Sequence, residues 1–207
     1  MNQQGASKNA IVGGIAFGGV AALLIAAVLF GGNLGEPSVS IEEVAGSPVI
    51  NGALPPMGNS NVDETATGLA APTVVGEDFD GNTVSIENDG RPKAIVFLAH
   101  WCPHCQAEVP SVQRWLNETG GVEGVDMYSV TTAIDARRTN YPPQLWLEDE
   151  GWTVPVIRDD VASSVLTAHG NGGFPFWVFT NSDGTVAVRI AGEIPISNLE
   201  AILSNLT

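Results

Sequence analysis

The chain has 207 residues, of which 23 are Asp or Glu and 8 are Lys or Arg, so its formal net charge is −15. This acidity argues against a nucleic-acid partner and against docking onto anionic lipid, because both carry negative charge. The length suits one globular domain with appended segments.

The first segment with a clear pattern is an uncharged apolar run over residues 10–30. As a helix this run would be about 31 Å long at about 1.5 Å per residue, enough to cross a bilayer core. Lys8 precedes it and only acidic residues follow for a long stretch, so the positive-inside rule puts residues 1–9 in the cytoplasm and the rest outside. A cleaved signal peptide is the alternative. The run is longer than a usual signal-peptide core and no small-residue cleavage site follows it, which favours a retained transmembrane anchor.

Residues 31–68 are rich in Gly, Pro, Ser and Asn and carry acidic residues but no base. Such a composition predicts a flexible acidic linker without regular structure. The folded domain is then expected at residues 69–207, held near the membrane by this tether.

Strands and helices alternate across residues 69–207. Two short β-branched runs flank Asp80-Gly81-Asn82, which predicts a β-hairpin. The apolar run 94–99 predicts a buried central strand, and apolar residues at helical spacing predict a helix over 103–118. This order predicts an α/β domain with a mixed sheet and helices on both faces. The remaining expected elements are strands at 125–131, 154–156, 176–180 and 185–190, the last two joined by a turn at 181–184, a loop at 135–140, and helices at 142–150, 160–168 and 197–204, the last with a capping box of Ser197 and Glu200.

Cys102 and Cys105 are the only cysteines of the chain, and Pro103 and His104 stand between them. A C-x-x-C pair after an apolar strand and at the start of a helix is the arrangement for reversible dithiol–disulfide exchange. Cys102 is expected at the helix N-terminus, where unpaired N–H groups and the helix dipole stabilise a thiolate. Cys102 is therefore the expected nucleophile, and Cys105, deeper in the helix, is the expected resolving thiol.

Two simpler explanations of the cysteine pair stand beside redox activity. A zinc site needs about four ligands, and the chain offers only three histidines, His100, His104 and His169, two of which crowd the cysteines. A purely structural disulfide would close a loop too short to constrain the unfolded chain much. Redox activity is therefore the favoured interpretation, with no metal and with no cofactor beyond the redox-active disulfide.

The domain resembles the thioredoxin superfamily, and within it the membrane-anchored, extracytoplasmic TlpA/ResA-like branch. The resemblance covers residues 69–207 and implies a thioredoxin fold with an N-terminal β-hairpin. It is carried by several features in order: Ala71-Pro72 and Asp80-Gly81 in the hairpin, the segment from Phe97 to Cys105, Glu108 and Pro110 after the cysteines, Gly173-Phe174-Pro175 before a strand, and then Asp183-Gly184 and Gly192.

The resemblance also implies a substrate-binding loop. Pro175 matches the superfamily's cis-proline, which leaves backbone groups free to pair with an extended substrate and keeps metal off the cysteines. Phe174 would add an apolar lip to the groove, and Trp101 is expected to form a wall beside the active site.

One departure from the superfamily concerns proton transfer. Thioredoxin carries a buried Asp on the strand before its active site, and the matching position here is Val96. Glu108 lies one helical turn after Cys105 and is the candidate to replace it, as in the TlpA-like branch. A partly buried Glu108 would have a raised pKa and could take the proton of Cys105.

His104 bears on the direction of the reaction. A protonated imidazole between the cysteines would favour the Cys102 thiolate, and stabilising the reduced form makes the pair a stronger oxidant. The Pro103-His104 dipeptide resembles that of the strongly oxidising DsbA-type enzymes, whereas the TlpA-like framework favours reduction. The balance leans to oxidation.

The expected function is that of a membrane-anchored, extracytoplasmic thiol–disulfide oxidoreductase. Its partners would be cysteine pairs of exported proteins and a membrane redox partner. One alternative is a disulfide reductase that supports cytochrome c maturation or thiol maintenance. Others are a metal-binding or copper-delivery module, although such modules typically use a C-x-x-x-C spacing, and a redox-inactive peptide-binding domain.

Overall fold

The computed structural model describes residues 39–207. A six-stranded sheet has the order β2-β9-β8-β5-β6-β7, and a three-stranded sheet has the order β1-β3-β4. The elements are α2 (Ile41–Val44), β1 (Val49–Asn51), β2 (Val62–Asp63), β3 (Thr73–Glu77), β4 (Thr83–Ile86), β5 (Lys93–Leu98), α3 (Pro103–Thr119), β6 (Asp126–Thr131), α4 (Pro143–Asp149), β7 (Val156–Arg158), α5 (Ser164–Ala168), β8 (Phe176–Thr180), β9 (Val186–Ala191) and α6 (Ile196–Ser204).

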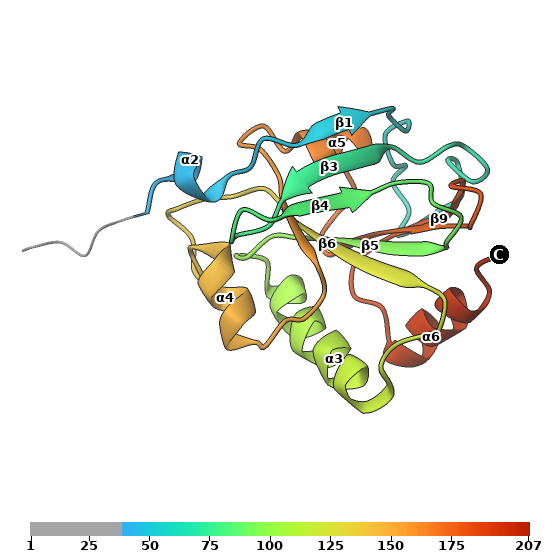
Figure 1. Cartoon of the computed structure of the whole chain (residues 1–207). Coiled ribbons are helices and arrows are strands. Elements are labelled where there is room, and N and C mark those ends of the chain that lie inside the picture. The colour runs from blue at the N-terminus through green and yellow to red at the C-terminus, as the bar shows by residue number, and fades with distance from the viewer. Residues whose placement is uncertain (1–38) are drawn as a thin grey trace, which may run out of the picture. The chain divides into compact units, whose positions relative to one another are not determined.

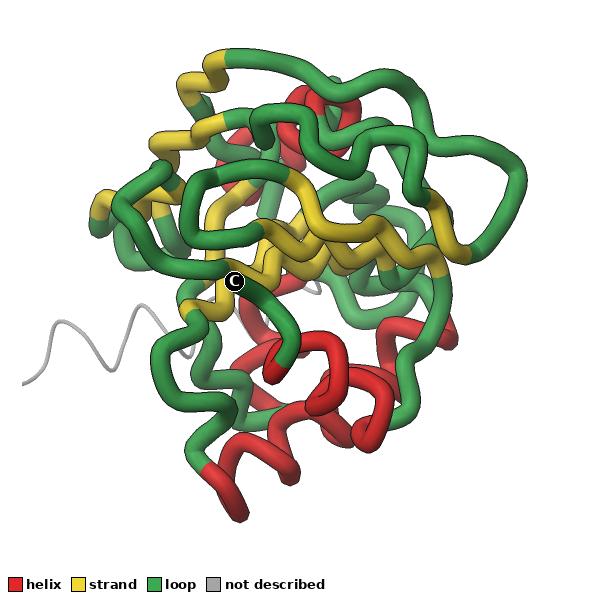
Figure 2. The backbone as a smooth tube through the Cα atoms, turned by 90° about the vertical axis from the view of Figure 1, so that its right-hand side faces the viewer, coloured by secondary structure: helices red, strands yellow, loops and turns green. Residues whose placement is uncertain are grey.

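The six-stranded sheet is mixed and lies between two layers. β5 pairs parallel with β6 and antiparallel with β8, and β6 pairs parallel with β7. Figure 1 shows α3, α4 and α6 on one side of this sheet, and α5 with the three-stranded sheet on the other side. Figure 2 shows the strands between these layers from the side. The expected mixed sheet with helices on both faces is confirmed.

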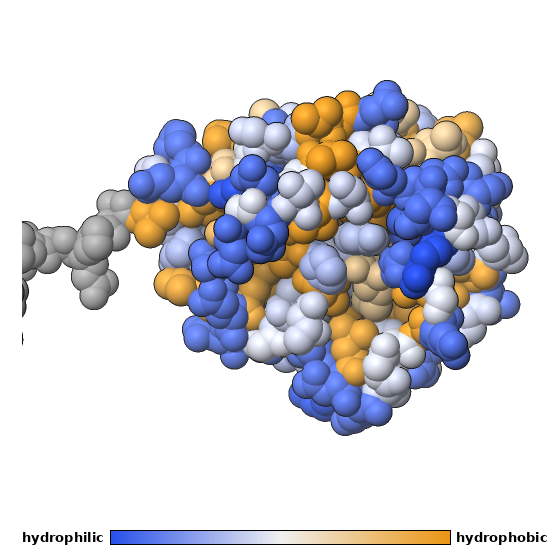
Figure 3. Space-filling model, in the orientation of Figure 1, coloured by the Kyte–Doolittle hydropathy of each residue, from blue (hydrophilic) through white to orange (hydrophobic). Residues whose placement is uncertain are grey.

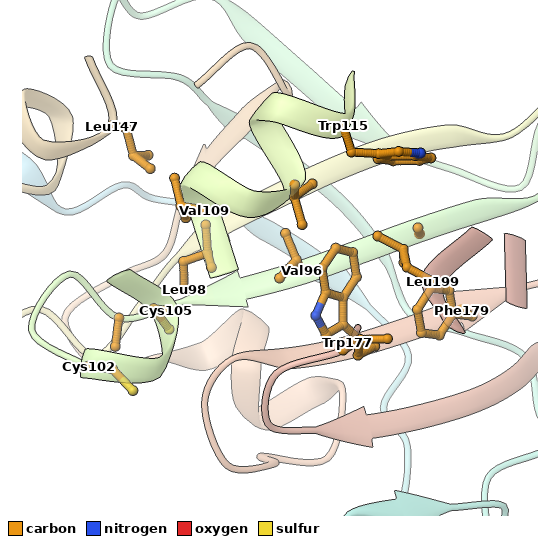
Figure 4. Packing of buried hydrophobic residues seen from close by; sticks show 14 of the residues in the cluster. Val96, Leu98, Cys102, Cys105, Val109, Trp115, Leu147, Trp177, Phe179 and Leu199 are labelled. Carbon is orange, nitrogen blue, oxygen red and sulfur yellow. The ribbon is translucent and has the colours of Figure 1, made fainter. Parts of the chain in front are cut away.

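The central strand β5 supplies core residues to both faces of the sheet. All six of its residues are buried, and side chains alternate between faces because a strand has a two-residue period. Val96 and Leu98 pack with α3 and α6, whereas Ile95 and Phe97 pack against the other layer. In Figure 4, Leu98 lies near Val109 and Cys105 of α3, and Val96 lies beside Trp177. The strand is thus fixed on both sides, and so is the loop that leads from it to the cysteines.

Helix α3 begins immediately after Cys102 with Pro103 at its first position, where a missing backbone N–H costs nothing. Its buried residues include Cys105, Val109 and Val112, which recur at the helical period. The helix ends at Gly120, whose φ of 75° is the left-handed conformation that glycine adopts at helix C-termini.

The expectation of a flexible linker is wrong for residues 39–68. β1 pairs with β3, and β2 pairs with β9. Leu54 and Ala66 are buried in the core cluster on the α5 side of the sheet. α2 is closed by a capping box of Ser40 and Glu43, a signal that the S-x-x-E spacing carries in the sequence. The folded unit therefore begins at Val39 rather than at residue 69.

A buried ion pair joins the segment before residue 69 to the sheet. Arg189 on β9 is fully buried, and its Nε and Nη2 atoms both donate to Asp63 Oδ2 on β2. Its Nη1 atom donates to the backbone carbonyl oxygens of Pro55 and His169, at 2.7 and 3.0 Å. Gly170 has a φ of 106°, and a Cβ there would lie 1.9 Å from Arg189 Nη1. Glycine is therefore required where the guanidinium passes the backbone.

Most other boundaries lie near the expected ones, but the strand expected at 154–156 lies at Val156–Arg158 and the helix expected at 160–168 forms only over Ser164–Ala168. Ser163, which precedes this helix, has a left-handed φ of 57°, so its backbone cannot continue a helix from residue 160.

The hairpin of β3 and β4 and the pairing of β8 with β9 are present as expected. The expected capping box of Ser197 and Glu200 is wrong, because α6 begins one residue earlier with Pro195 as its N-cap. Glu200 instead accepts a hydrogen bond from Trp115 Nε1 at 2.7 Å. This contact ties α6 to α3 across the same face of the sheet.

Hydrophilic and hydrophobic residues are interspersed on the face of the molecule seen in Figure 3. Among residues 39–207, no helix has the length and apolar character needed to cross a membrane. The transmembrane anchor expected at residues 10–30, the cytoplasmic segment 1–9 and the first part of the linker lie outside the described residues.

Candidate active site

Cys102 is the N-cap residue of α3, with extended backbone angles of φ −79° and ψ 120°. Its backbone N–H donates to Ala99 O at 2.9 Å, and its Sγ lies 3.8 Å from Phe174 O. The side chain is 6% exposed, whereas Cys105 is completely buried. Both are free thiols. The expected order of accessibility is confirmed, because Cys102 is the sulfur nearer to solvent and to the Phe174 carbonyl.

Burial raises the pKa of Cys105 well above its ordinary value, and the neighbouring Cys102 and Glu108 raise it further. The resolving thiol is therefore held in its protonated form in the reduced protein. Since only the thiolate attacks a disulfide, this thiol needs a group that removes its proton during the reaction.

Glu108 is the carboxyl group expected to take this proton. Its side chain is buried at 3% exposure, one helical turn after Cys105. Trp177 Nε1 donates to Glu108 Oε1 at 3.0 Å, and the backbone N–H of Ile194 donates to both carboxylate oxygens at 3.2 and 3.3 Å. Burial outweighs these hydrogen bonds and raises the pKa of Glu108 to about 7. A carboxyl group with this pKa can both accept and return a proton near neutral pH.

The Glu108→Gln variant tests this role. In the wild type, resolution of the mixed disulfide should accelerate as the pH rises through about 7, because Glu108 ionises there. In the variant this step should be slower by about 10²-fold and should lose the inflection near neutral pH. The measurement is a pH profile of product-thiol release by stopped flow.

Glu118→Gln is the matched control, because it removes the same charge from an exposed position on the same helix. It should retain the wild-type profile. An unchanged rate and pH profile in Glu108→Gln would remove Glu108 from the reaction.

His104 has a partner that the sequence did not indicate. Its Nδ1 atom lies 2.6 Å from Glu193 Oε1, in the loop that follows β9. The next residue of this loop, Ile194, holds Glu108 through its backbone N–H. One loop thus contacts His104, which stands between the cysteines, and Glu108, which follows them. The two partners are 89 residues apart in the chain, so no local pattern could have found this contact.

The residues expected to bind substrate gather beside Cys102. The Phe174–Pro175 peptide bond is cis, as the resemblance implied. The ring of Trp101 meets that of Phe174 edge-on at a centroid distance of 6.0 Å, and Trp101 Nε1 donates to Ala133 O at 2.7 Å. Phe174 also lines a groove of about 630 Å³ together with His104 and with residues of β9, α6 and the segment before β2. Phe174 therefore lies between the ring of Trp101 and this groove.

The loop that contains Asp135 and Thr139 packs against His100, two residues before Cys102. The ring of His100 is buried, with Nδ1 2.7 Å from Thr139 O and with Nε2 3.3 Å from the donating backbone N–H of Asp135. Burial lowers the pKa of His100, so it is a neutral structural residue near neutral pH. The Tyr141–Pro142 bond in the same loop is also cis, which the sequence analysis did not anticipate.

His169, the third histidine, lies among buried residues, and its Nδ1 lies 2.8 Å from Val165 O. Within residues 39–207, no group of three or more His, Cys, Asp or Glu side chains is arranged to hold a metal ion.

Comparisons with known proteins find a redox family and thiol-disulfide proteins as relatives. A family model described as Redoxin matches residues 66–203. Over 133 residues, the chain is 25% identical to the thiol-disulfide oxidoreductase ResA of Oceanobacillus iheyensis, an alignment that covers 64% of this chain and 66% of that protein. Over 119 residues it is 25% identical to the thiol:disulfide interchange protein TxlA homolog of Synechocystis sp., covering 58% of this chain and 51% of that protein. The chain therefore spans between about half and two thirds of the length of these curated relatives.

Solved structures with the same fold include StoA from Bacillus subtilis, with a TM-score of 0.53, 18% identity and coverage of 62% of this chain and 94% of that chain. Another is a secreted Mycobacterium tuberculosis disulfide oxidoreductase homologous to E. coli DsbE, with a TM-score of 0.53, 18% identity and coverage of 64% and 95%. At this identity the likeness concerns the fold, and it confirms the expected thioredoxin-like α/β domain.

Proposed function

Because this chain belongs to the Redoxin family, within the TlpA/ResA-like part of the thioredoxin superfamily, we propose that it is a thiol–disulfide oxidoreductase. The observation that carries the proposal is the unequal placement of its two thiols. Cys102 is the N-cap of α3 and lies beside the Phe174 carbonyl. Cys105 is completely buried one turn before Glu108 on the same helix. This is the division between a nucleophilic and a resolving thiol that exchange requires.

The reaction proceeds in two balanced steps. In reduction of a partner, the Cys102 thiolate attacks one sulfur of the partner disulfide, the other sulfur leaves as a thiolate, and a mixed disulfide forms. Cys105 then passes its proton to Glu108 and attacks Cys102 Sγ, which releases the second partner thiolate and leaves a Cys102–Cys105 disulfide. Two electrons move from the protein to the partner, and oxidation of a partner dithiol runs the same steps in reverse.

The proposed setting is extracytoplasmic. The apolar run at residues 10–30 would anchor the chain in the membrane, and the domain would act on cysteine pairs of exported proteins together with a membrane redox partner. The uncharged character of that run and the absence of bases between residues 9 and 90 support this orientation.

Oxidation is the proposed direction, and the support is the imidazole of His104 between the two cysteines. A protonated His104 favours the Cys102 thiolate and so raises the reduction potential. Reduction is the second candidate, and the contact of His104 with Glu193 favours it. A carboxylate at this distance cancels part of the imidazolium charge that the thiolate would otherwise feel.

The reduction potential of the purified full-length chain in a glutathione buffer tests the function and its direction. A value near −120 to −150 mV, on the scale set by DsbA, would support an oxidase, and a value at or below about −250 mV would support a reductase. His104→Ala should lower the potential, while Arg114→Ala, which removes an exposed cation roughly 14 Å along α3 from Cys105, should not. A cysteine pair that never equilibrates with glutathione would contradict the proposed function itself.

A further inference from the structure

Exposed positive charge is scarce on this chain. Of its 8 Lys and Arg residues, Lys8 lies outside the described residues, which leaves seven between residues 39 and 207. Lys93 and Arg189 are buried, and the side chain of Arg158 is only 14% exposed. The remaining four are exposed, namely Arg91, Arg114, Arg137 and Arg138.

One of these four exposed cations, Arg138, stacks on the aromatic ring that precedes the reactive thiol in the chain. The guanidinium carbon of Arg138 lies over the ring of Trp101, 5.0 Å from its centroid, and Trp101 immediately precedes Cys102. Trp101 in turn packs against Phe174, whose carbonyl oxygen lies 3.8 Å from Cys102 Sγ. A chain of contacts therefore runs from Arg138 through Trp101 and Phe174 to Cys102.

The guanidinium N–H groups of Arg138 form no hydrogen bond within the described residues. The nearby carboxylate of Asp135 accepts hydrogen bonds from Arg137 Nε at 3.1 Å and Nη2 at 3.4 Å. The contact of Arg138 Nε with Asp135 Oδ2 is longer, at 3.6 Å. Its side chain is 58% exposed, and the indole beneath it holds it in place through a cation–π contact.

We propose that Arg138, supported by Arg137, is a specificity determinant that favours partner proteins with Asp or Glu next to the reacting cysteine. The inference rests on the proposed function. Trp101 lies between Arg138 and Phe174, so a partner segment that crosses Trp101 to reach Cys102 brings its neighbouring side chains within reach of the guanidinium. A fixed guanidinium pairs with a carboxylate through two parallel N–H bonds. On a chain with net charge −15, this cation next to the active-site ring gives acidic partner segments a local site of favourable charge.

The test uses three peptides, each with one cysteine carried as a mixed disulfide with thionitrobenzoate and flanked by Glu, by Ser or by Lys. Attack of the Cys102 thiolate on the peptide sulfur releases the coloured thiolate, and the second-order rate constant is measured with the full-length chain. The observable is the ratio of the rates for the Glu and Lys peptides. Comparing this ratio between variants cancels the intrinsic reactivity of each peptide's cysteine.

Arg138→Glu should lower this ratio by about fivefold relative to the wild type, the upper range for an exposed ion pair. Arg114→Glu changes the net charge equally from an exposed position on α3, and it should lower the ratio by less than about twofold because screening weakens distant charges. The Ser peptide should react at similar rates with all three proteins, and high salt should reduce the effect of Arg138→Glu.

Equal shifts of the ratio in Arg138→Glu and Arg114→Glu would overturn the inference, because the effect would then be one of net charge alone. In that case the Ser peptide would still react and the proposed function would stand. Failure of all three peptides to react with the wild type would instead refute the proposed function, and the inference would fall with it.

Discussion

Replacing Cys102 by Ser is expected to reduce disulfide exchange to its uncatalysed background, and replacing Cys105 by Ser is expected to trap the partner. A serine hydroxyl in place of the Cys102 thiol cannot form a disulfide, so the first step is lost. In Cys105→Ser the first step remains, because Cys102 still caps α3 beside Phe174 O. The mixed disulfide then persists, since its resolving thiol is gone.

Mass spectrometry of the intact chain after reaction with a disulfide peptide measures both outcomes. Cys105→Ser should retain one equivalent of peptide, Cys102→Ser should retain none, and the wild type should release its peptide and gain an internal disulfide. Retention by Cys102→Ser and not by Cys105→Ser would reverse the two roles. Retention by neither variant would favour a redox-inactive peptide-binding domain.

The Asp63→Ala variant is expected to lower the free energy of unfolding by about 3–5 kcal/mol, the usual effect of breaking a buried ion pair. Asp63 is 3% exposed and Arg189 is fully buried, so the guanidinium would lose its charge partner in a site shielded from solvent. Burial alone would raise the pKa of Asp63, but hydrogen bonds from Thr65 and Arg189 outweigh it and hold that pKa below its ordinary value. The stabilisation is therefore present at neutral pH and is lost as the pH falls below about 4.

Urea unfolding of the full-length wild type and variant at several pH values measures this effect. Glu77→Gln is the control, since it breaks a pair with Arg158 in which the Glu77 side chain is 57% exposed, and it should cost at most about 1 kcal/mol. The double variant Asp63→Leu with Arg189→Met should lose less free energy of unfolding than the two single variants lose together, because it leaves no charge unpaired. If Asp63→Ala unfolds at the same urea concentration as the wild type, the ion pair does not stabilise the packing of the segment before residue 69.

Local patterns in the sequence predicted much of the fold correctly. The apolar run of β5, the turn at Asp80-Gly81-Asn82 and the helical spacing after Cys105 each depend on neighbouring residues, and each element formed where expected. The N-terminal position of Cys102 and the burial of Cys105 and Glu108 follow from the same periodicity.

Residues 39–68 show what local patterns miss. β1 and β2 have three and two residues, too few for an alternation of polar and apolar side chains to be recognised. Their stability comes from β3 and β9, and from Arg189, which lies 126 residues after Asp63. A polar segment thus resembles a linker in the sequence and becomes part of the domain when distant partners bind it.

The position of the cysteine motif was determined by the sequence alone, because spacing along a strand and a helix places Cys102 at a helix start and Cys105 and Glu108 on one face of that helix. The surroundings of that motif were decided only by the tertiary structure. Glu193 meets His104 across 89 residues, and Arg138 reaches the ring of Trp101 from a separate loop. Such contacts depend on how the sheet brings loops together at one edge, which no short-range pattern encodes.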